Sequence, residues 1–248
     1  MARLQDFPSV TPTASDNILI VQSTGQGLAS VGSTLGAKMD SANPTGSGAF
    51  SMNRAPGSSV GTNSVAEGNS CTASGDNGAH AEGYITEASG RNSHSEGRYT
   101  IANHRSQHVF GEYNIADTAG TPNTARGAYI EIIGKGTAAD SRSNARTLDW
   151  NGNETIAGTL TQSSDEKLKD VKNEVIPDVS AVKAVRFTWK KDADRDDSEH
   201  IGYLAQDVEK VLPFLVKEDA EGNKVLDYIA FLVAKVDNLE KRIAELEK

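Results

Sequence analysis

The feature that most constrains the fold is a short glycine-centred repeat in the first half of the chain. Successive copies carry Gly68, Gly83, Gly97 and Gly111, which are spaced by 15, 14 and 14 residues. A fixed short period with a glycine at each corner is typical of a solenoid in which every turn is one repeat. Small and polar residues alternate within each copy, which favours short strands over helix. The repeats therefore predict a solenoid of strands over residues 46–117.

The segments on either side of the repeats also have strand patterns. In residues 1–45, two short apolar runs flank a glycine turn and predict a small hairpin. In residues 118–164, an alternating run is followed by an Asn151-Gly152 turn, a strong hairpin signal. We expect the first segment to attach the chain to a larger assembly and the second to form a β stalk.

The composition limits how much core this region can build. Apolar residues make up 37% of the chain and aromatic residues 6%, which is little for a compact globule. Such a region is disordered, or it takes its core from repeats or from other chains. Because the chain has only seven prolines, we favour oligomerisation over disorder.

Charge and cysteine content narrow the function classes. The net charge of −9 argues against a nucleic-acid or anionic-membrane partner. Cys71 is the single cysteine, so no intrachain disulfide is possible, as suits a reducing cytoplasm. The amino terminus does not resemble a signal peptide, and no apolar run is long enough to span a bilayer. We expect no membrane insertion and no secretion by a signal peptide.

Three histidines share the period of the repeats. His80, His94 and His108 lie 14 residues apart, so they are predicted to stack in one column. One interpretation is that three chains direct these imidazoles towards a common axis to bind a metal or an anion. The other is a solvated polar ladder on the outer face, which we favour because no His-x-His spacing is present. Glu82 and Glu96 form a similar column with the same interpretation, and we expect no cofactor.

A change of composition marks the start of the last third of the chain. A Gly/Ser/Thr/Asn-rich region gives way to one rich in Lys, Glu, Asp, Leu and Val, and Ser164, Asp165 and Lys169 lie at this boundary. A lysine can take the proton of a serine hydroxyl once burial disfavours its charged form. The same residues also suit a helix start with Ser164 as the N-cap, and spacing alone favours that structural role.

Further landmarks follow this boundary. Residues 182–190 predict a helix end that runs into a strand, and residues 200–213 predict a strand and then a helix stopped by proline. The terminal segment, 229–248, carries heptads that predict a coiled coil. Its apolar positions are Ile229, Leu232, Val236, Leu239, Ile243 and Leu246. Ile or Val paired with Leu favours a dimer by the usual rule, whereas a three-chain stalk favours a trimer.

The order Ser-Asp-Glu-x-Leu-Lys, Gly-Tyr-Leu-Ala-Gln-Asp-Val and Asp-Tyr over residues 163–248 closely resembles the intramolecular chaperone of endosialidase-type tailspikes and tail fibres. The repeats resemble the β-roll heads of trimeric adhesins and of phage tail proteins. The first resemblance implies a trimerising chaperone that then removes itself by autoproteolysis between Ser164 and Asp165, as a single-turnover serine peptidase. It implies Ser164 as the catalytic serine and Lys169 as its partner. His200 and Gln206 lie on the shared motifs and could assist catalysis or be structural.

The identity of the attacking group stays open. If Ser164 attacked its own carbonyl, a four-membered ring would form, so a lysine-activated serine, a neighbouring chain or a water molecule are all alternatives. Ser163 is the alternative nucleophile, and Lys167 is the alternative base.

These observations together predict a mainly β fold with an α+β C-terminal domain. We expect a homotrimeric β-roll or β-prism stalk, followed by a chaperone over 165–248 that ends in the coiled coil. The expected function is a phage or prophage tail fibre or tailspike, made in the host cytoplasm and carried on the virion. It would bind a tail or baseplate protein through its N-terminus and a host-surface glycan or protein receptor.

Two other functions are compatible with parts of this pattern. The first is a trimeric adhesin-like protein whose C-terminus is a permanent trimerisation clamp without cleavage. The second is a glycan-cleaving enzyme within residues 46–160, which would need paired carboxylates in a groove lined by aromatic residues. The acidic residues are spread along the repeats with few aromatic residues beside them, so this alternative ranks low.

Overall fold

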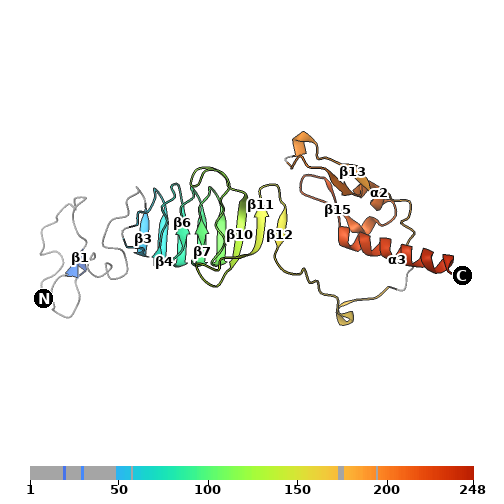
Figure 1. Cartoon of the computed structure of the whole chain (residues 1–248), viewed down its shortest axis with the longest axis horizontal. Helices are drawn as coiled ribbons and strands as arrows, with labels where there is room; N and C mark the ends of the chain where they lie inside the picture. The colour runs from blue at the N-terminus through green and yellow to red at the C-terminus, as the bar shows by residue number, and fades with distance from the viewer. Residues whose placement is uncertain (1–18, 21–28, 31–48, 57, 173–175, 194) are drawn as a thin grey trace, which may run out of the picture. The chain divides into compact units, whose positions relative to one another are not determined.

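The structure is a computed structural model of the chain, and it describes residues 19–20, 29–30, 49–56, 58–172, 176–193 and 195–248. The chain divides into two compact units, Met1–Leu160 and Thr161–Lys248 (Figure 1). Within the described ranges, none of the helices has the length and apolar character needed to cross a membrane.

The N-terminal hairpin is described only at its two strands. β1 (Leu19–Ile20) pairs antiparallel with β2 (Ala29–Ser30), as the two apolar runs predict. The rest of the predicted segment 1–45 lies outside the described residues.

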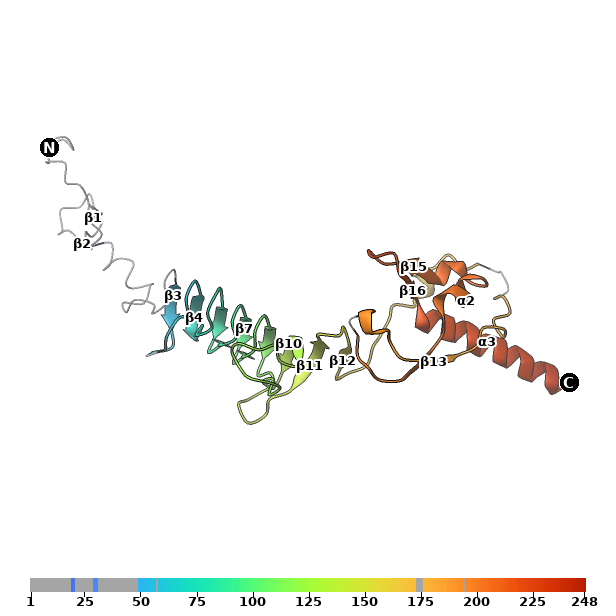
Figure 2. The ribbon, with the colours of Figure 1, turned by 90° about the horizontal axis from the view of Figure 1, so that it is seen from above.

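The repeats form a β-solenoid whose strands stack one above the next (Figures 1 and 2). The parallel strands are β3 (Phe50–Arg54), β4 (Val65–Cys71), β5 (His80–Tyr84), β7 (His94–Arg98), β9 (His108–Glu112) and β10 (Tyr129–Lys135). A second pair, β6 (Glu87–Ala88) and β8 (Ile101–Ala102), is also parallel. The register joins Gly68 to Gly83 and Gly83 to Gly97, so these repeats each supply one strand of the large sheet.

The sheet is completed by an antiparallel hairpin. β11 (Asn144–Asp149) pairs with β10 on one side and with β12 (Glu154–Ile156) on the other. The turn between β11 and β12 contains the predicted Asn151-Gly152, and the Asp149 carboxylate accepts hydrogen bonds from the backbone N–H groups of Asn151 and Asn153. The hairpin prediction is confirmed.

The solenoid core contains a ladder of buried side chains, formed by the second residue of β4, β5, β7 and β9 and the fourth residue of β10. Ala66, Ala81, Ser95, Val109 and Ile132 are fully buried and follow one another in register. Residues on either side of each of them point outwards, as expected for a two-residue period. The repeats thus supply this core within one chain, which is one of the two sources that the low apolar content left open.

The corner glycines are required by their backbone conformation and by close approach. Gly68, Gly83, Gly97 and Gly111 have φ values of 112°, 109°, 101° and 92°. A Cβ atom on Gly83 would lie 2.2 Å from the carbonyl oxygen of Gly97 on the next turn. Glycine is therefore the residue that permits this stacking.

The C-terminal unit is a small α+β fold. Two antiparallel pairs, β13 (Val185–Phe187) with β14 (His200–Gly202) and β15 (Val216–Glu218) with β16 (Lys224–Leu226), accompany the helices. The helical elements are η2 (Glu166–Leu168), η3 (Lys191–Ala193), α2 (Ala205–Glu209), η4 (Pro213–Leu215) and α3 (Tyr228–Leu246). The core residues are Val179, Val182, Val208, Leu212, Leu215, Phe231 and Ala234. The predicted fold class, mainly β with an α+β C-terminal domain, is confirmed.

The long helix α3 organises this unit from its inner face. Phe231 and Ala234 are buried in the core. Lys235 Nζ donates hydrogen bonds of 2.6 Å to the carbonyl oxygens of Val179 and Val182. The Asn238 side-chain oxygen accepts from the Val179 N–H at 2.8 Å. The helix end predicted at residue 182, before β13, is wrong. Residues 179–182 form a turn, whose carbonyl oxygens accept hydrogen bonds from Lys235 of α3.

Candidate active site

The predicted serine and lysine are in direct contact. Lys169 Nζ donates a hydrogen bond of 2.6 Å to Ser164 Oγ. Both side chains are exposed, as are all residues from 151 to 172. In one copy of the chain, therefore, no protein surface shields the amine from solvent.

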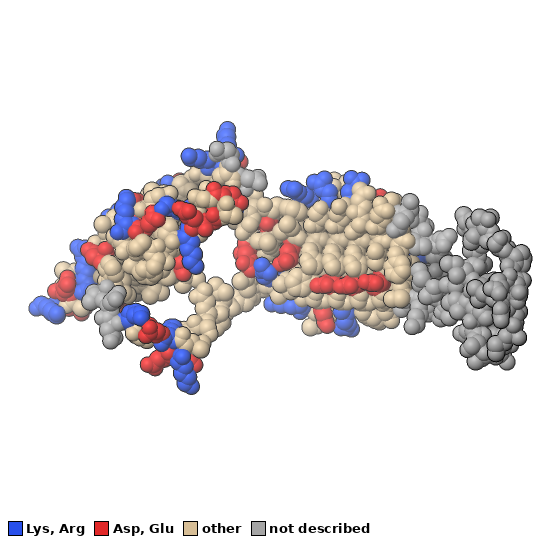
Figure 3. Space-filling model, turned by 180° about the vertical axis from the view of Figure 1, so that it is seen from behind, with Lys and Arg blue, Asp and Glu red and all other residues tan. Residues whose placement is uncertain are grey.

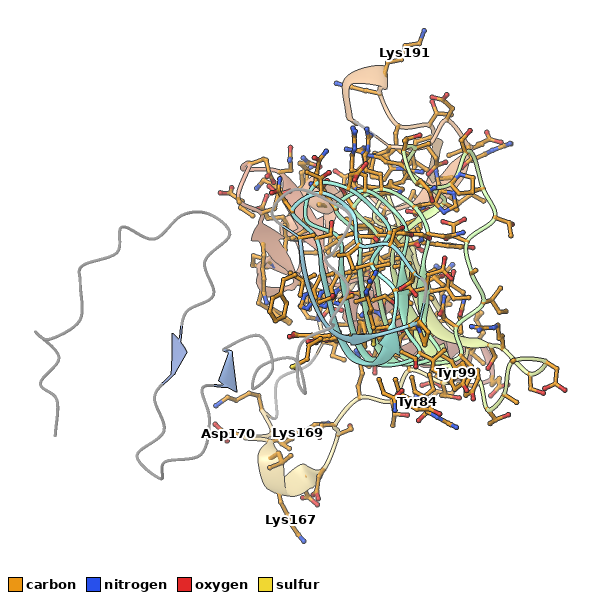
Figure 4. All side chains as sticks on the ribbon, turned by 90° about the vertical axis from the view of Figure 1, so that its left-hand side faces the viewer. Tyr84, Tyr99, Lys167, Lys169, Asp170 and Lys191 are labelled. Carbon is orange, nitrogen blue, oxygen red and sulfur yellow. The ribbon has the colours of Figure 1, made fainter. Side chains whose placement is uncertain are left out.

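A single 3₁₀ turn produces this contact. Asp165 is the N-cap of η2, and its Oδ1 accepts from the Lys167 N–H at 2.9 Å. The alternative in which Ser164 is the N-cap is therefore wrong, because Asp165 accepts the hydrogen bond from the Lys167 N–H. Lys169 is the C-cap of the same turn, which brings its side chain back to Ser164. Lys167, the alternative base, extends away from the turn (Figure 4).

The two auxiliary residues lie elsewhere in the unit. His200 is on β14, where its Nε2 lies 3.2 Å from Asp196 Oδ1 and 3.1 Å from Ser198 Oγ. Gln206 is exposed in α2. Within the described part of the chain, no hydrogen bond or ion pair joins Ser164 or Lys169 to either of them. The structure thus brings two of the four predicted residues together.

His200 has partners that the sequence motifs do not indicate. Its ring stacks on Phe187 with centroids 5.4 Å apart. The Ser198 hydroxyl donates to the Asp196 carboxylate. This bond, the Ser198 N–H and then His200 lower the pKa of Asp196 below its usual value. The sequence signal for this cluster was that Asp196, Ser198 and His200 are spaced two residues apart. The local backbone brings their side chains together.

Lys235 is a second residue that sequence reasoning missed. Burial, and then the charge of Lys183, lower the pKa of Lys235. Its position in α3, four residues after Phe231 and three before Asn238 on the inner face, was the only signal. Since its amine binds two carbonyl oxygens, its role is to hold the 179–182 turn against the helix.

The histidine column has the predicted arrangement. His80 and His94 stack with ring centroids 4.7 Å apart, and His94 and His108 follow at 4.9 Å. The three rings alternate with the buried ladder, so they lie on the outside of the solenoid. Glu82 and Glu96 form the neighbouring column on the same strands.

Comparison with known protein families identifies a similarity in the C-terminal unit. Residues 164–217 match the family model described as chaperone of endosialidase. The match begins at Ser164 and extends through η2, α2 and most of β15. No curated protein matches the chain significantly. The C-terminal unit is thus similar to the self-cleaving intramolecular chaperones, and a β-solenoid followed by such a chaperone fits a protein of the tail-fibre type.

Proposed function

We propose that this chain is a homotrimeric phage or prophage tail-fibre or tailspike protein that attaches a virion to its host. Its C-terminal unit would be an intramolecular chaperone that assists trimer folding and is then released by cleavage between Ser164 and Asp165. The observation that carries this proposal is the Lys169–Ser164 hydrogen bond of 2.6 Å at the first residue of the family match.

In the proposed reaction, Lys169 in its neutral form accepts the proton of the Ser164 hydroxyl. The activated oxygen takes a proton from a water molecule, which adds to the Ser164 carbonyl carbon. The tetrahedral intermediate expels the Asp165 amine, and Lys169 returns its proton to that amine. The products are a carboxylate on Ser164 and an amino terminus on Asp165. Attack by water avoids the four-membered ring that direct attack by Ser164 would require.

The terminal helix supports an oligomer. The heptad side chains of α3 are between 48% and 79% exposed in one chain. They lie on a different face from the buried Phe231 and Ala234, so α3 is apolar on two sides. An apolar stripe with this spacing is typical of a coiled coil. We infer that three copies bury it, and that a neighbouring copy also supplies the groups that Ser164 and Lys169 lack in one chain.

The solenoid is the proposed receptor-contacting part. Tyr84 and Tyr99 project from one side of it (Figure 4), with ring centroids 5.5 Å apart. The Arg98 guanidinium lies 5.6 Å from the centre of the Tyr99 ring. Aromatic and guanidinium groups at a surface suit a glycan or protein receptor. The N-terminal segment would dock to a tail or baseplate protein.

The cleavage proposal is tested by comparing matched serine and lysine variants. The wild type should yield fragments 1–164 and 165–248 on a denaturing gel, with masses that place the cut after Ser164. Ser164→Ala and Lys169→Met should remain whole, whereas Ser163→Ala and Lys167→Met should still be cut. If only Ser163→Ala and Lys167→Met prevented cleavage, the roles assigned to Ser164 and Lys169 would be overturned.

The trimer is tested on the uncut Ser164→Ala chain by sedimentation equilibrium, with three copies as the expected mass. A wild-type chain that stays whole but trimeric would exclude autoproteolysis and favour the adhesin-like protein with a permanent clamp. A monomer would refute the assembly.

A further inference from the structure

The outer face of the solenoid carries histidine and glutamate side chains at fixed positions on successive strands. His80 and Glu82 are two residues apart on β5, and His94 and Glu96 occupy the same positions on β7. Glu67 of β4 lies in register with Glu82. Figure 3 shows a row of acidic side chains along the solenoid. The repeat thus places two parallel columns, one of imidazoles and one of carboxylates, beside each other.

The donor atoms of these columns converge in two groups of three. Glu67, His80 and Glu82 form one group, Glu82, His94 and Glu96 form the other, and within each group the donor atoms lie within 4.8 Å of one another. For a tetrahedral ion with bonds of about 2.1 Å, neighbouring donors are about 3.4 Å apart. The His80 Nε2–Glu67 Oε1 distance is 3.2 Å, and the distance to Glu82 Oε2 is 3.9 Å. The first distance already suits such an ion, and the second exceeds the ideal separation by only about 0.5 Å.

Glu82 belongs to both groups through different oxygens. Its Oε2 faces His80, and its Oε1 lies 3.9 Å from His94 Nε2. A carboxylate oriented in this way can bridge two ions, with one oxygen on each. The spacing between stacked strands therefore sets the spacing between the two groups.

The imidazoles of the column are held in order by stacking. Neighbouring rings lie within 10° of parallel. A ring that is already ordered loses less conformational freedom when it binds an ion.

Two of the ring nitrogens are also unsatisfied. Nε2 of His94 and Nε2 of His108 are shielded from solvent and have no hydrogen-bond partner among the described residues. Their nearest carboxylates, at 3.9 Å, are too distant for a hydrogen bond. A simple ion-pair ladder leaves these nitrogens without a partner, whereas a bound cation would satisfy His94.

The carboxylates remain accessible from the side. Glu82 and Glu96 line a shallow hollow with Phe110 and the corner glycines Gly83, Gly97 and Gly111. Because these glycines carry no side chain, an ion with its remaining water ligands has room beside the carboxylates.

We propose that Glu67, His80, Glu82, His94 and Glu96 bind two divalent transition-metal ions on the solenoid face, with Glu82 as the bridging ligand. One imidazole and two carboxylates per ion suit Zn²⁺, Co²⁺ or Mn²⁺, and water completes the coordination. The ions would join β4, β5 and β7 across the stack and stabilise this part of the solenoid, because they bind the folded state.

The test is a Co²⁺ titration of the tag-free Ser164→Ala full-length chain after treatment with a chelator, followed by visible absorption and calorimetry. Two ions per chain are expected, with a rise in the thermal unfolding midpoint. Glu82→Gln should lose both ions, and His94→Gln should retain one. His108→Gln and Glu87→Gln are matched controls that should retain two, since neither residue belongs to a group.

Circular dichroism without metal establishes that each variant is folded. If Glu82→Gln does not fold, His80→Gln and His94→Gln decide the question, since each should lose one ion. No binding by the folded parent chain, or binding that these substitutions leave unchanged, would overturn the proposal. The metal site on the solenoid does not involve Ser164. A negative metal titration therefore leaves the proposed function intact, and the cleavage assay tests that function separately.

Discussion

The corner glycines offer the sharpest test of how the repeat produces the solenoid. In Gly83→Ala, the new Cβ would lie 2.2 Å from the Gly97 carbonyl oxygen, and the backbone φ of 109° is one that alanine rarely adopts. The conformational strain costs about 1–3 kcal/mol, and shifting the next turn to relieve the overlap costs about 1–3 kcal/mol more. The free energy of unfolding should therefore fall by about 4 kcal/mol.

The chain provides two controls that separate these contributions. Gly222 has a φ of 81°, and a Cβ atom at this position would have no atom within 4 Å, so Gly222→Ala tests strain without overlap. Gly158 has neither a positive φ nor a neighbour within 4 Å of such a Cβ atom, so Gly158→Ala should be neutral. The order of destabilisation should be Gly83→Ala, then Gly222→Ala, then Gly158→Ala.

Thermal unfolding followed by circular dichroism in the uncut Ser164→Ala background measures these effects. Gly83→Ala and Gly158→Ala are compared at the transition of the first unit, and Gly222→Ala at that of the C-terminal unit. For a unit of this size, about 4 kcal/mol corresponds to a decrease of roughly 8–16 °C in the unfolding midpoint. Hydrogen exchange at the backbone N–H groups of β5 and β7 should report the loss at the altered turn. A midpoint for Gly83→Ala within about 2 °C of the parent would refute the close stacking on which the solenoid depends.

Three further predictions concern the helix α3 and the histidine column. Val236→Asp should abolish the proposed trimer and leave each copy folded. Phe231→Ala should instead destabilise the C-terminal unit by about 3–5 kcal/mol. Sedimentation and urea unfolding distinguish the two effects. Asp227→Ala removes the N-cap that accepts from the Ala230 N–H and should cost about 1 kcal/mol in urea unfolding. Because the folded pKa of His94 lies below the unfolded value of 6.5, the unfolded state binds the proton more tightly, and stability should be lost as the pH falls below that value. In His94→Gln, measured with a chelator between about pH 5 and pH 8, this loss should be smaller.

Much of the solenoid is predictable because its repeat determines the register directly. One repeat per turn places Ala66, Ala81 and Ser95 one above another. The residues directly before and after each of them then share the outer face. The stacking of the histidines follows from the same register. That the core closes within one chain was not predictable from the low apolar content, because apolar content alone does not distinguish a core built from repeats from one shared between chains.

The geometry of the candidate active site was only partly predictable. Ser164 and Asp165 are both good N-cap residues, and the backbone of the turn, not residue type, decides that Asp165 accepts the free N–H. That choice leaves the Ser164 hydroxyl to Lys169. The Lys235 contacts with the 179–182 turn connect segments more than fifty residues apart, and no local pattern contains that information.

The location of the proposed cut links the chemistry to assembly. Ser164 and Asp165 lie in a stretch whose side chains are all exposed from residue 151 to residue 172, so cleavage there removes no buried contact from either unit. Lys169 is exposed in one copy, and a lysine can act as a base once burial disfavours its charged form. If that surface is a neighbouring copy held by α3, cleavage can follow only after the chains have assembled. The irreversible step is then delayed until the chaperone has completed its role, and the solenoid retains its folded state after the helix that guided it is gone.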